Sequence, residues 1–168
     1  MQQKYIRLGG ALLIGGYFAH CAHTPTDWHF IDSANLIFHE AGHAIFFFLG
    51  HFVQVAMGSG LQILLPLSIA AYFFYHRQLY EGSITLMWAG QNMINVSVYA
   101  GDAISMQLPL LGGDYVIHDW NYMLTALHAL PQTPYVAATL YGCGTTAIIA
   151  GFVLAIYFVF SNTAAKAV

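Results

Sequence analysis

Charge is the scarcest property of this 168-residue sequence. Only 7% of its residues are charged, with four Lys and Arg against seven Asp and Glu. An ordinary soluble domain carries about 25% charged residues. So few charges cannot cover the surface of a globule in water, which excludes that class of protein. The net charge of −3 and the lack of a basic patch also exclude nucleic acid as a partner.

Cysteine is scarce as well. Cys21 and Cys143 are the only two, they lie in or beside apolar runs, and no CxxC spacing exists. We interpret both as packing residues and expect no disulfide. The sequence also has no repeat, no low-complexity tract and no separate soluble segment. It therefore predicts a single integral membrane domain over residues 1–168.

Apolar residues are correspondingly abundant and make up 58% of the chain. A membrane-spanning helix needs about 20 mostly apolar residues, and unpaired backbone in lipid favours helices over open sheets. We therefore predict an all-α polytopic membrane protein with about five transmembrane helices and the lipid bilayer as its environment. The predicted spans are residues 5–22, 28–49, 61–75, 83–103 and 135–160.

The few basic residues indicate an orientation. Lys4 and Arg7 precede the first span, and basic residues favour the cytoplasmic side. We expect a retained first span with a cytoplasmic N-terminus, in the bacterial inner membrane.

One motif stands out in the second span: His39-Glu40-Ala41-Gly42-His43. Histidines four apart lie on one face of a helix and can bind a single Zn²⁺. Glu40 is placed to take a proton from a water that the metal activates. Three ionisable groups within two turns of an apolar helix cost several kcal/mol unless they are paired or bound. The motif therefore predicts one zinc ion per chain.

A catalytic zinc usually takes three protein ligands, so a third must come from elsewhere. Asp102, at the predicted inner end of the fourth span, is our first choice because its depth matches that of the histidine pair. The alternative is a plain carboxylate at a helix end. His118 and Asp119 are the runners-up, as third ligand or as part of a lid, if the long segment 104–134 folds back over the site. Within that segment, residues 120–130 could form an amphipathic helix closed by Pro131.

Two further polar residues lie on one face of the fourth span. Asn92 and Asn95 are three apart and are candidates for binding substrate or for orienting the metal ligands by hydrogen bonds. Ordinary interhelical hydrogen bonds are the alternative. Asp32 precedes His39 on the second span, as a step in a proton path or as a simple carboxylate in the first helical turn.

The helix that carries the motif is expected to end at Gly50. Residues 51–57 contain β-branched and aromatic residues and lead to Gly58-Ser59-Gly60. This pattern predicts a short strand-like hairpin after the helix.

Together, HEAGH in an apolar helix, the stop at Gly50, the strand-like Val53-Gln54-Val55 and a later span with Asn95 ahead of Asp102 resemble the site-2 protease family of intramembrane zinc metalloproteases. The resemblance covers about residues 36–103. Here no proline lies between Asn95 and Asp102, and Ala103 stands where that family has glycine. The resemblance implies a minimal catalytic core without a PDZ domain. Its activity would be hydrolysis of a peptide bond in or next to a transmembrane segment of a protein substrate.

Two other functions are compatible with the residues. One is a catalytically inactive relative that acts as a membrane binding protein or chaperone. The other is a membrane subunit that binds haem or another redox metal through some of its nine histidines, of which His20, His23, His51 and His76 lie near span ends.

Overall fold

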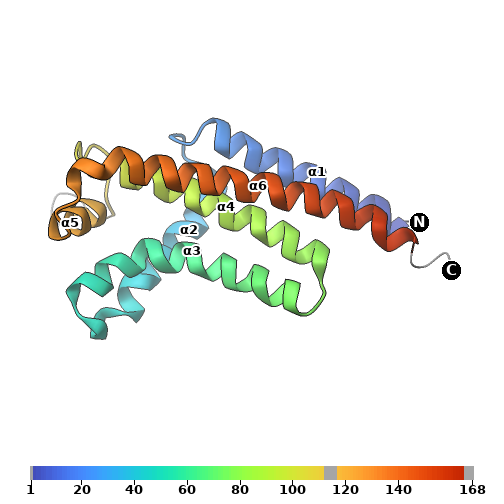
Figure 1. The fold of residues 1–168 in the computed structure, drawn as a ribbon, viewed down its shortest axis with the longest axis horizontal. Helices are drawn as coiled ribbons and strands as arrows, with labels where there is room; N and C mark the ends of the chain where they lie inside the picture. The colour runs from blue at the N-terminus through green and yellow to red at the C-terminus, as the bar shows by residue number, and fades with distance from the viewer. Residues whose placement is uncertain (1, 112–116, 165–168) are drawn as a thin grey trace.

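The computed structural model describes residues 2–111 and 117–164, and every regular element in them is a helix. Three long helices run side by side along the molecule: α1 (Gln2–His23), α4 (Leu79–Gly101) and α6 (Thr133–Ala164). As Figure 1 shows, α2 (Phe30–Ile45) and α3 (His51–Tyr75) form a second group against α4. The short α5 (Asp119–Ala126) lies at the end of the molecule opposite the chain termini. The described residues therefore agree with the predicted all-α class.

Two of these helical segments are long and apolar enough to cross a membrane. They are α3 and the segment Leu130–Ser161, which comprises the 3₁₀ turn η3 (Leu130–Gln132) and most of α6. The other predicted spans correspond to α1, α2 and α4. At about 1.5 Å per residue, the 16 residues of α2 extend about 24 Å, which is less than the roughly 30 Å of a bilayer core. Five membrane spans therefore stay a prediction.

The predicted strand-like hairpin is wrong. Residues 51–57 are the first two turns of α3, which runs unbroken past Pro66 to Tyr75. The helix α2 ends at Ile45, and a 3₁₀ turn η1 (Phe47–Leu49) leads to Gly50, whose φ of 90° reverses the chain. The β-branched residues after Gly50 lower helix propensity by only a few tenths of a kcal/mol each. In apolar surroundings, internal satisfaction of every backbone group outweighs that cost.

The helices α4 and α6 approach each other at a pair of glycines. A Cβ on Gly144 would lie 2.5 Å from the backbone oxygen of Gly90, and a Cβ on Gly90 would lie 2.5 Å from the backbone oxygen of Gly144. Such close contact lets the two backbones pack directly against each other. The core residues Met87, Ile94 and Ile148 then pack on either side of the contact.

This contact gives a stability prediction. Gly144→Ala should lower the free energy of unfolding by about 1–3 kcal/mol, because the added methyl meets backbone that cannot move without separating the helices. Gly142→Ala is the matched control on the same helix, since its Cβ would have no neighbour within 4 Å. Unfolding in mixed micelles of rising SDS content would measure both. Equal stability of the two variants would contradict the described packing.

Candidate metal centre

The two motif histidines lie where α2 crosses α3. A Cβ on Gly42 would overlap the backbone of Met57, and a Cβ on Gly58 would lie 2.5 Å from Nε2 of His43 and 2.8 Å from Nε2 of His39. The two helices therefore touch backbone to backbone, and both imidazole rings sit over Gly58. Gly42, the glycine of the motif, allows this close approach of α2 to α3 and so places the histidine pair against α3.

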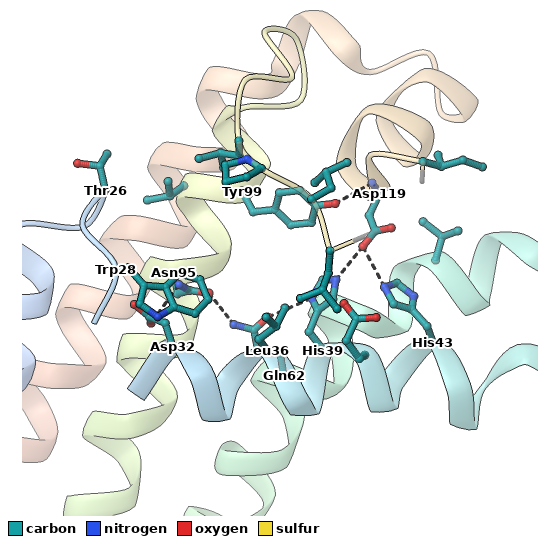
Figure 2. A pocket seen from close by; sticks show the side chains of 18 of the residues that line it. Thr26, Trp28, Asp32, Leu36, His39, His43, Gln62, Asn95, Tyr99 and Asp119 are labelled. Atoms are coloured by element: carbon teal, nitrogen blue, oxygen red, sulfur yellow. Dashed lines mark hydrogen bonds and ion pairs between the residues drawn. The ribbon is translucent and has the colours of Figure 1, made fainter. Parts of the chain in front are cut away.

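A carboxylate from a distant part of the chain completes the group. Oδ2 of Asp119 lies 2.9 Å from Nε2 of His39 and 3.2 Å from Nε2 of His43. One ligand atom from each of the three residues lies within 4.8 Å of the others. Figure 2 shows the two rings from α2 and the carboxylate of α5 pointing at one another. Two imidazole nitrogens and a carboxylate oxygen are the donor set of many zinc sites.

Contacts to α3 and α4 hold Asp119 in place. Its backbone N–H donates to Tyr99 Oη on α4 at 3.0 Å. The next residue, Trp120, donates from its indole to Ser59 Oγ on α3 at 3.1 Å. His118 caps the start of α5 by accepting from the backbone N–H of Asn121. The short helix is thus fixed against both neighbours at the residue that faces the histidines.

Electrostatics keep the Asp119 side chain an anion. Burial raises the pKa of its carboxyl, but the adjacent imidazoles of His39 and His43 lower it further, so the pKa lies below the ordinary value. The group is therefore a carboxylate at neutral pH.

The other nitrogen of each motif histidine is also engaged. Nδ1 of His43 donates to the backbone oxygen of Gln54 at 2.9 Å, and Nδ1 of His39 donates to Oε1 of Gln62 at 3.1 Å. Bonds of this kind orient a metal-binding imidazole and leave Nε2 to bind the metal. Gln62 is a residue to which sequence reasoning gave no role. Its one signal was that it is the only strongly polar side chain in the predicted span 61–75.

Asp102, the first choice for the third ligand, lies elsewhere. Its carboxylate accepts from Ser105 Oγ at 2.5 Å and from the backbone N–H groups of Gln107 and Leu108 at 2.9 Å each. It thereby closes the turn after α4. Oδ2 also lies 3.4 Å from Nε2 of His118, in an ion-pair contact.

The structure therefore brings together His39, His43 and Asp119, and it does not bring Asp102 to them. Asp119 was one of the two alternatives, and it reaches the site as expected for a segment that folds back. His118, the other alternative, contacts Asp102 and the start of α5. The predicted amphipathic helix at residues 120–130 begins one residue earlier, at Asp119, and ends at Ala126.

The two asparagines of α4 differ in their surroundings. Asn92 is fully buried and donates to the backbone oxygen of Trp88 within its own helix. Asn95 accepts from Gln62 Nε2 at 2.8 Å and donates to Asp32 Oδ1 at 3.1 Å. Only Asn95 is therefore connected to the histidine pair, through Gln62.

A cavity of about 600 Å³ opens onto the group. Its walls include all three of the potential ligands and the motif carboxylate, Glu40. Glu40 itself is exposed. Residues 108–111, Ile117 and Trp28 also line the cavity. Its lining thus combines apolar and polar groups, which suits a chain segment that carries both side chains and a backbone amide.

Comparisons with known proteins add no assignment. No protein-family model matches the chain, and neither a curated protein nor a solved structure is significantly similar to it.

Proposed function

We propose that this protein is an intramembrane zinc metalloprotease, which hydrolyses peptide bonds in or next to the transmembrane segments of protein substrates. One observation carries the proposal. Two imidazole nitrogens and a carboxylate oxygen converge in a cavity that a further carboxylate, Glu40, also lines. Catalytic zinc sites have three such ligands and keep a fourth position open.

The donor set fits zinc on chemical grounds. Nδ1 of His43 faces a backbone carbonyl, which only accepts, so Nδ1 carries a proton and Nε2 is the nitrogen left for a metal. Nε2 lies 3.2 Å from the anionic Asp119 oxygen. Without a metal, a proton on Nε2 joins these two atoms, and a zinc ion would take the place of that proton. His39, His43 and Asp119 would hold the zinc.

Each residue then has a defined task. Bound zinc supplies a Lewis acid that polarises the scissile carbonyl and lowers the pKa of water. Glu40 acts as the general base, takes a proton from the attacking water onto its carboxylate, and delivers it to the leaving amine. Leu36 and Val98 add apolar surface to the cavity wall, and apolar surroundings strengthen electrostatic interactions.

The membrane setting is part of the proposal. Apart from α3 and α6, large apolar side chains are exposed on other helices, including Leu13 and Ile37 at 77% and 67%. Such surfaces suit lipid. Lys4 and Arg7 lie at one end of α1, and Arg7 pairs with Glu81 beside the α3–α4 turn that contains Arg77. Gathering of basic residues at this end supports a cytoplasmic N-terminus in a bacterial inner membrane.

Membership of the site-2 protease family belongs to the same proposal. The HEAGH helix supports it, together with a carboxylate as third ligand. Here that ligand, Asp119, follows α4 by a long connection. The presence of Glu40 in the cavity that the three potential ligands line favours an active enzyme over an inactive relative. The haem alternative has less support, because His51 and His76 lie at opposite ends of α3.

Metal analysis and cleavage test the proposal together. Purified protein should contain one zinc per chain, show no visible absorbance and cleave a single-span membrane substrate. Removal of the metal with a chelator should abolish cleavage, and added Zn²⁺ should restore it. Colour from haem, or cleavage that survives complete metal removal, would contradict the proposal.

A further inference from the structure

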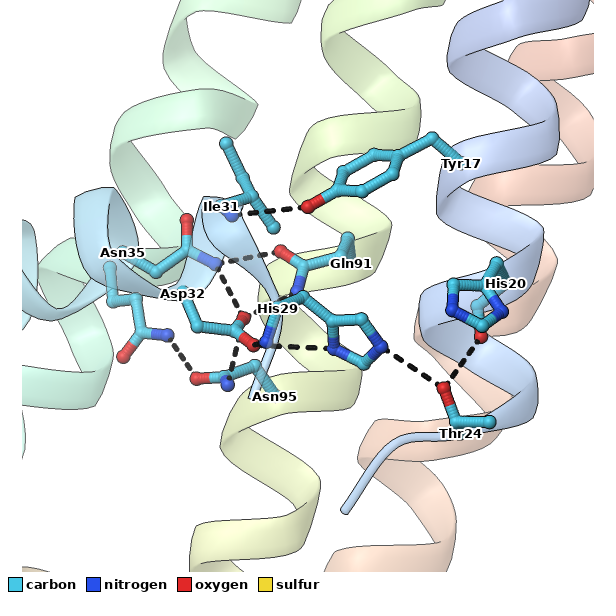
Figure 3. Close-up of polar contacts among 10 residues, drawn as sticks. Tyr17, His20, Thr24, His29, Ile31, Asp32, Asn35, Gln91 and Asn95 are labelled. Atoms are coloured by element: carbon cyan, nitrogen blue, oxygen red, sulfur yellow. Dashed lines mark hydrogen bonds and ion pairs between the residues drawn. The ribbon is translucent and has the colours of Figure 1, made fainter. Parts of the chain in front are cut away.

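A chain of side-chain hydrogen bonds connects His39 to a buried carboxylate, Asp32. Asp32 lies in the first turn of α2 and is 2% exposed. Its Oδ1 accepts from Asn95 at 3.1 Å, Asn95 accepts from Gln62 at 2.8 Å, and Gln62 accepts from Nδ1 of His39 at 3.1 Å. Figure 3 shows the amide groups gathered around Asp32. The chain passes through α2, α4 and α3 in turn.

The carboxylate sets the direction of every bond in this chain. An ionised carboxylate only accepts hydrogen bonds, so Asn95 must turn its NH₂ group to Asp32. The oxygen of Asn95 then faces Gln62, which must turn its own NH₂ group to it. The oxygen of Gln62 is thereby left facing His39, whose Nδ1 has to donate. The orientation of a single Asn or Gln amide is ambiguous by itself. Here the carboxylate of Asp32 fixes the orientation of both amides in the chain.

A second branch reaches the same carboxylate from a group that only donates. The indole of Trp88 donates to Asn35 Oδ1 at 3.0 Å. Asn35 donates to Gln91 Oε1 at 2.7 Å, and Gln91 donates to Asp32 Oδ1 at 2.8 Å. An indole N–H cannot accept, so this branch also has one possible direction. Both branches require Asp32 to be the acceptor.

We infer that Asp32 is a positioning residue for the metal centre, which acts through Asn95 and Gln62 to hold the proton of His39 on Nδ1 and free its Nε2 for the metal. The inference rests on the proposed function in treating His39 as a ligand. His43 needs no such chain, because the backbone oxygen of Gln54 fixes its ring directly. Asp32 itself does not touch the metal position.

Asp32→Asn tests this role. An amide at position 32 can donate as well as accept, so the chain loses its fixed direction. We expect zinc affinity to fall about 10- to 100-fold, the usual effect of removing a partner that orients a metal ligand. Asp27→Asn is the matched control, since it removes the same charge from the same cavity outside the hydrogen-bonded chain. Asp27→Asn should keep wild-type affinity, and an equal loss in both variants would overturn the inference.

A structural role must be separated from a positioning role, because Asp32 also accepts from the backbone N–H of His29 and caps α2. Nitrogen NMR of histidine-labelled, metal-free protein reports which ring nitrogen carries the proton. It is recorded in the Asp119→Ala background, because the Asp119 carboxylate lies 2.9 Å from Nε2 of His39 and would itself hold a proton there. The His39 signal, identified by its loss in His39→Gln, should show a proton on Nδ1 in Asp119→Ala and a mixture when Asp32→Asn is added. An unchanged Nδ1–H signal in Asp32→Asn would overturn the inference.

A second substitution provides rescue. Gln62→Glu places an acceptor-only group directly on His39, so in the Asp32→Asn background it should restore both the Nδ1–H signal and most of the zinc affinity. A purely structural defect at position 32 would not be repaired from α3, and failure of rescue would overturn the inference. Because the NMR measurement needs no metal, the expected proton position in that experiment, together with wild-type protein that has no zinc affinity, would overturn the proposed function alone.

Discussion

Glu40→Gln should abolish cleavage while leaving zinc bound. Glu40 lines the same cavity as the three potential ligands, but it is not one of the three. The amide of Glu40→Gln therefore removes the base and leaves the metal ligands in place. General acid–base catalysis contributes about 10²- to 10⁴-fold. We therefore expect cleavage of a model transmembrane substrate to fall by at least about 100-fold, with one zinc per chain retained.

The matched control for this variant is Glu81→Gln. Glu81 is the other glutamate of the chain, and it pairs with Arg7 at 2.8 Å, away from the cavity. The same change of charge and shape there should leave the turnover rate close to that of wild type. Equal activity of Glu40→Gln and wild type would remove Glu40 from the mechanism.

Asp119→Ala should release the zinc. The variant deletes one of three ligands, and loss of a partner that merely orients a ligand already costs about 10- to 100-fold in affinity. We expect a loss of at least about 100-fold, measured by competition with a chromophoric chelator. Cleavage should be lost in parallel at limiting zinc.

Asp102→Asn separates the two candidate carboxylates. Asp102 closes the turn after α4 through Ser105 and Leu108, so its loss should loosen that turn and leave zinc bound. Retention of full zinc affinity in Asp119→Ala, together with its loss in Asp102→Asn, would reverse the assignment of the third ligand.

The sequence was most informative where the signal is local. An i, i+4 histidine pair needs only helical periodicity, so HEAGH predicted a shared face for His39 and His43, and the structure places their rings on it. Apolar runs predicted helices at about the right places, because length and composition decide a helix in apolar surroundings. The prediction of a strand after Gly50 was wrong because it gave more weight to a few β-branched residues than to the need to pair their backbone groups.

The remaining features depend on contacts between distant residues. Asp102 and Asp119 are both single carboxylates after the same helix, and the position of α5 decides which one meets α2. Contacts such as the Trp120–Ser59 hydrogen bond fix that position, and periodicity in the sequence does not reveal them. The role of Gln62 was not predicted for the same reason, because its hydrogen-bond partners lie on two other helices.

Asp119, the proposed third ligand, lies 80 residues after His39 in the chain. Helices α2, α3 and α4 are therefore synthesised, and can pack, before Asp119 exists. Since chains grow from the N-terminus at about 5–20 residues per second, the nascent protein spends several seconds with only two ligands in place. Under the proposed function, the order of synthesis would therefore delay zinc binding and catalysis until α5 has been made.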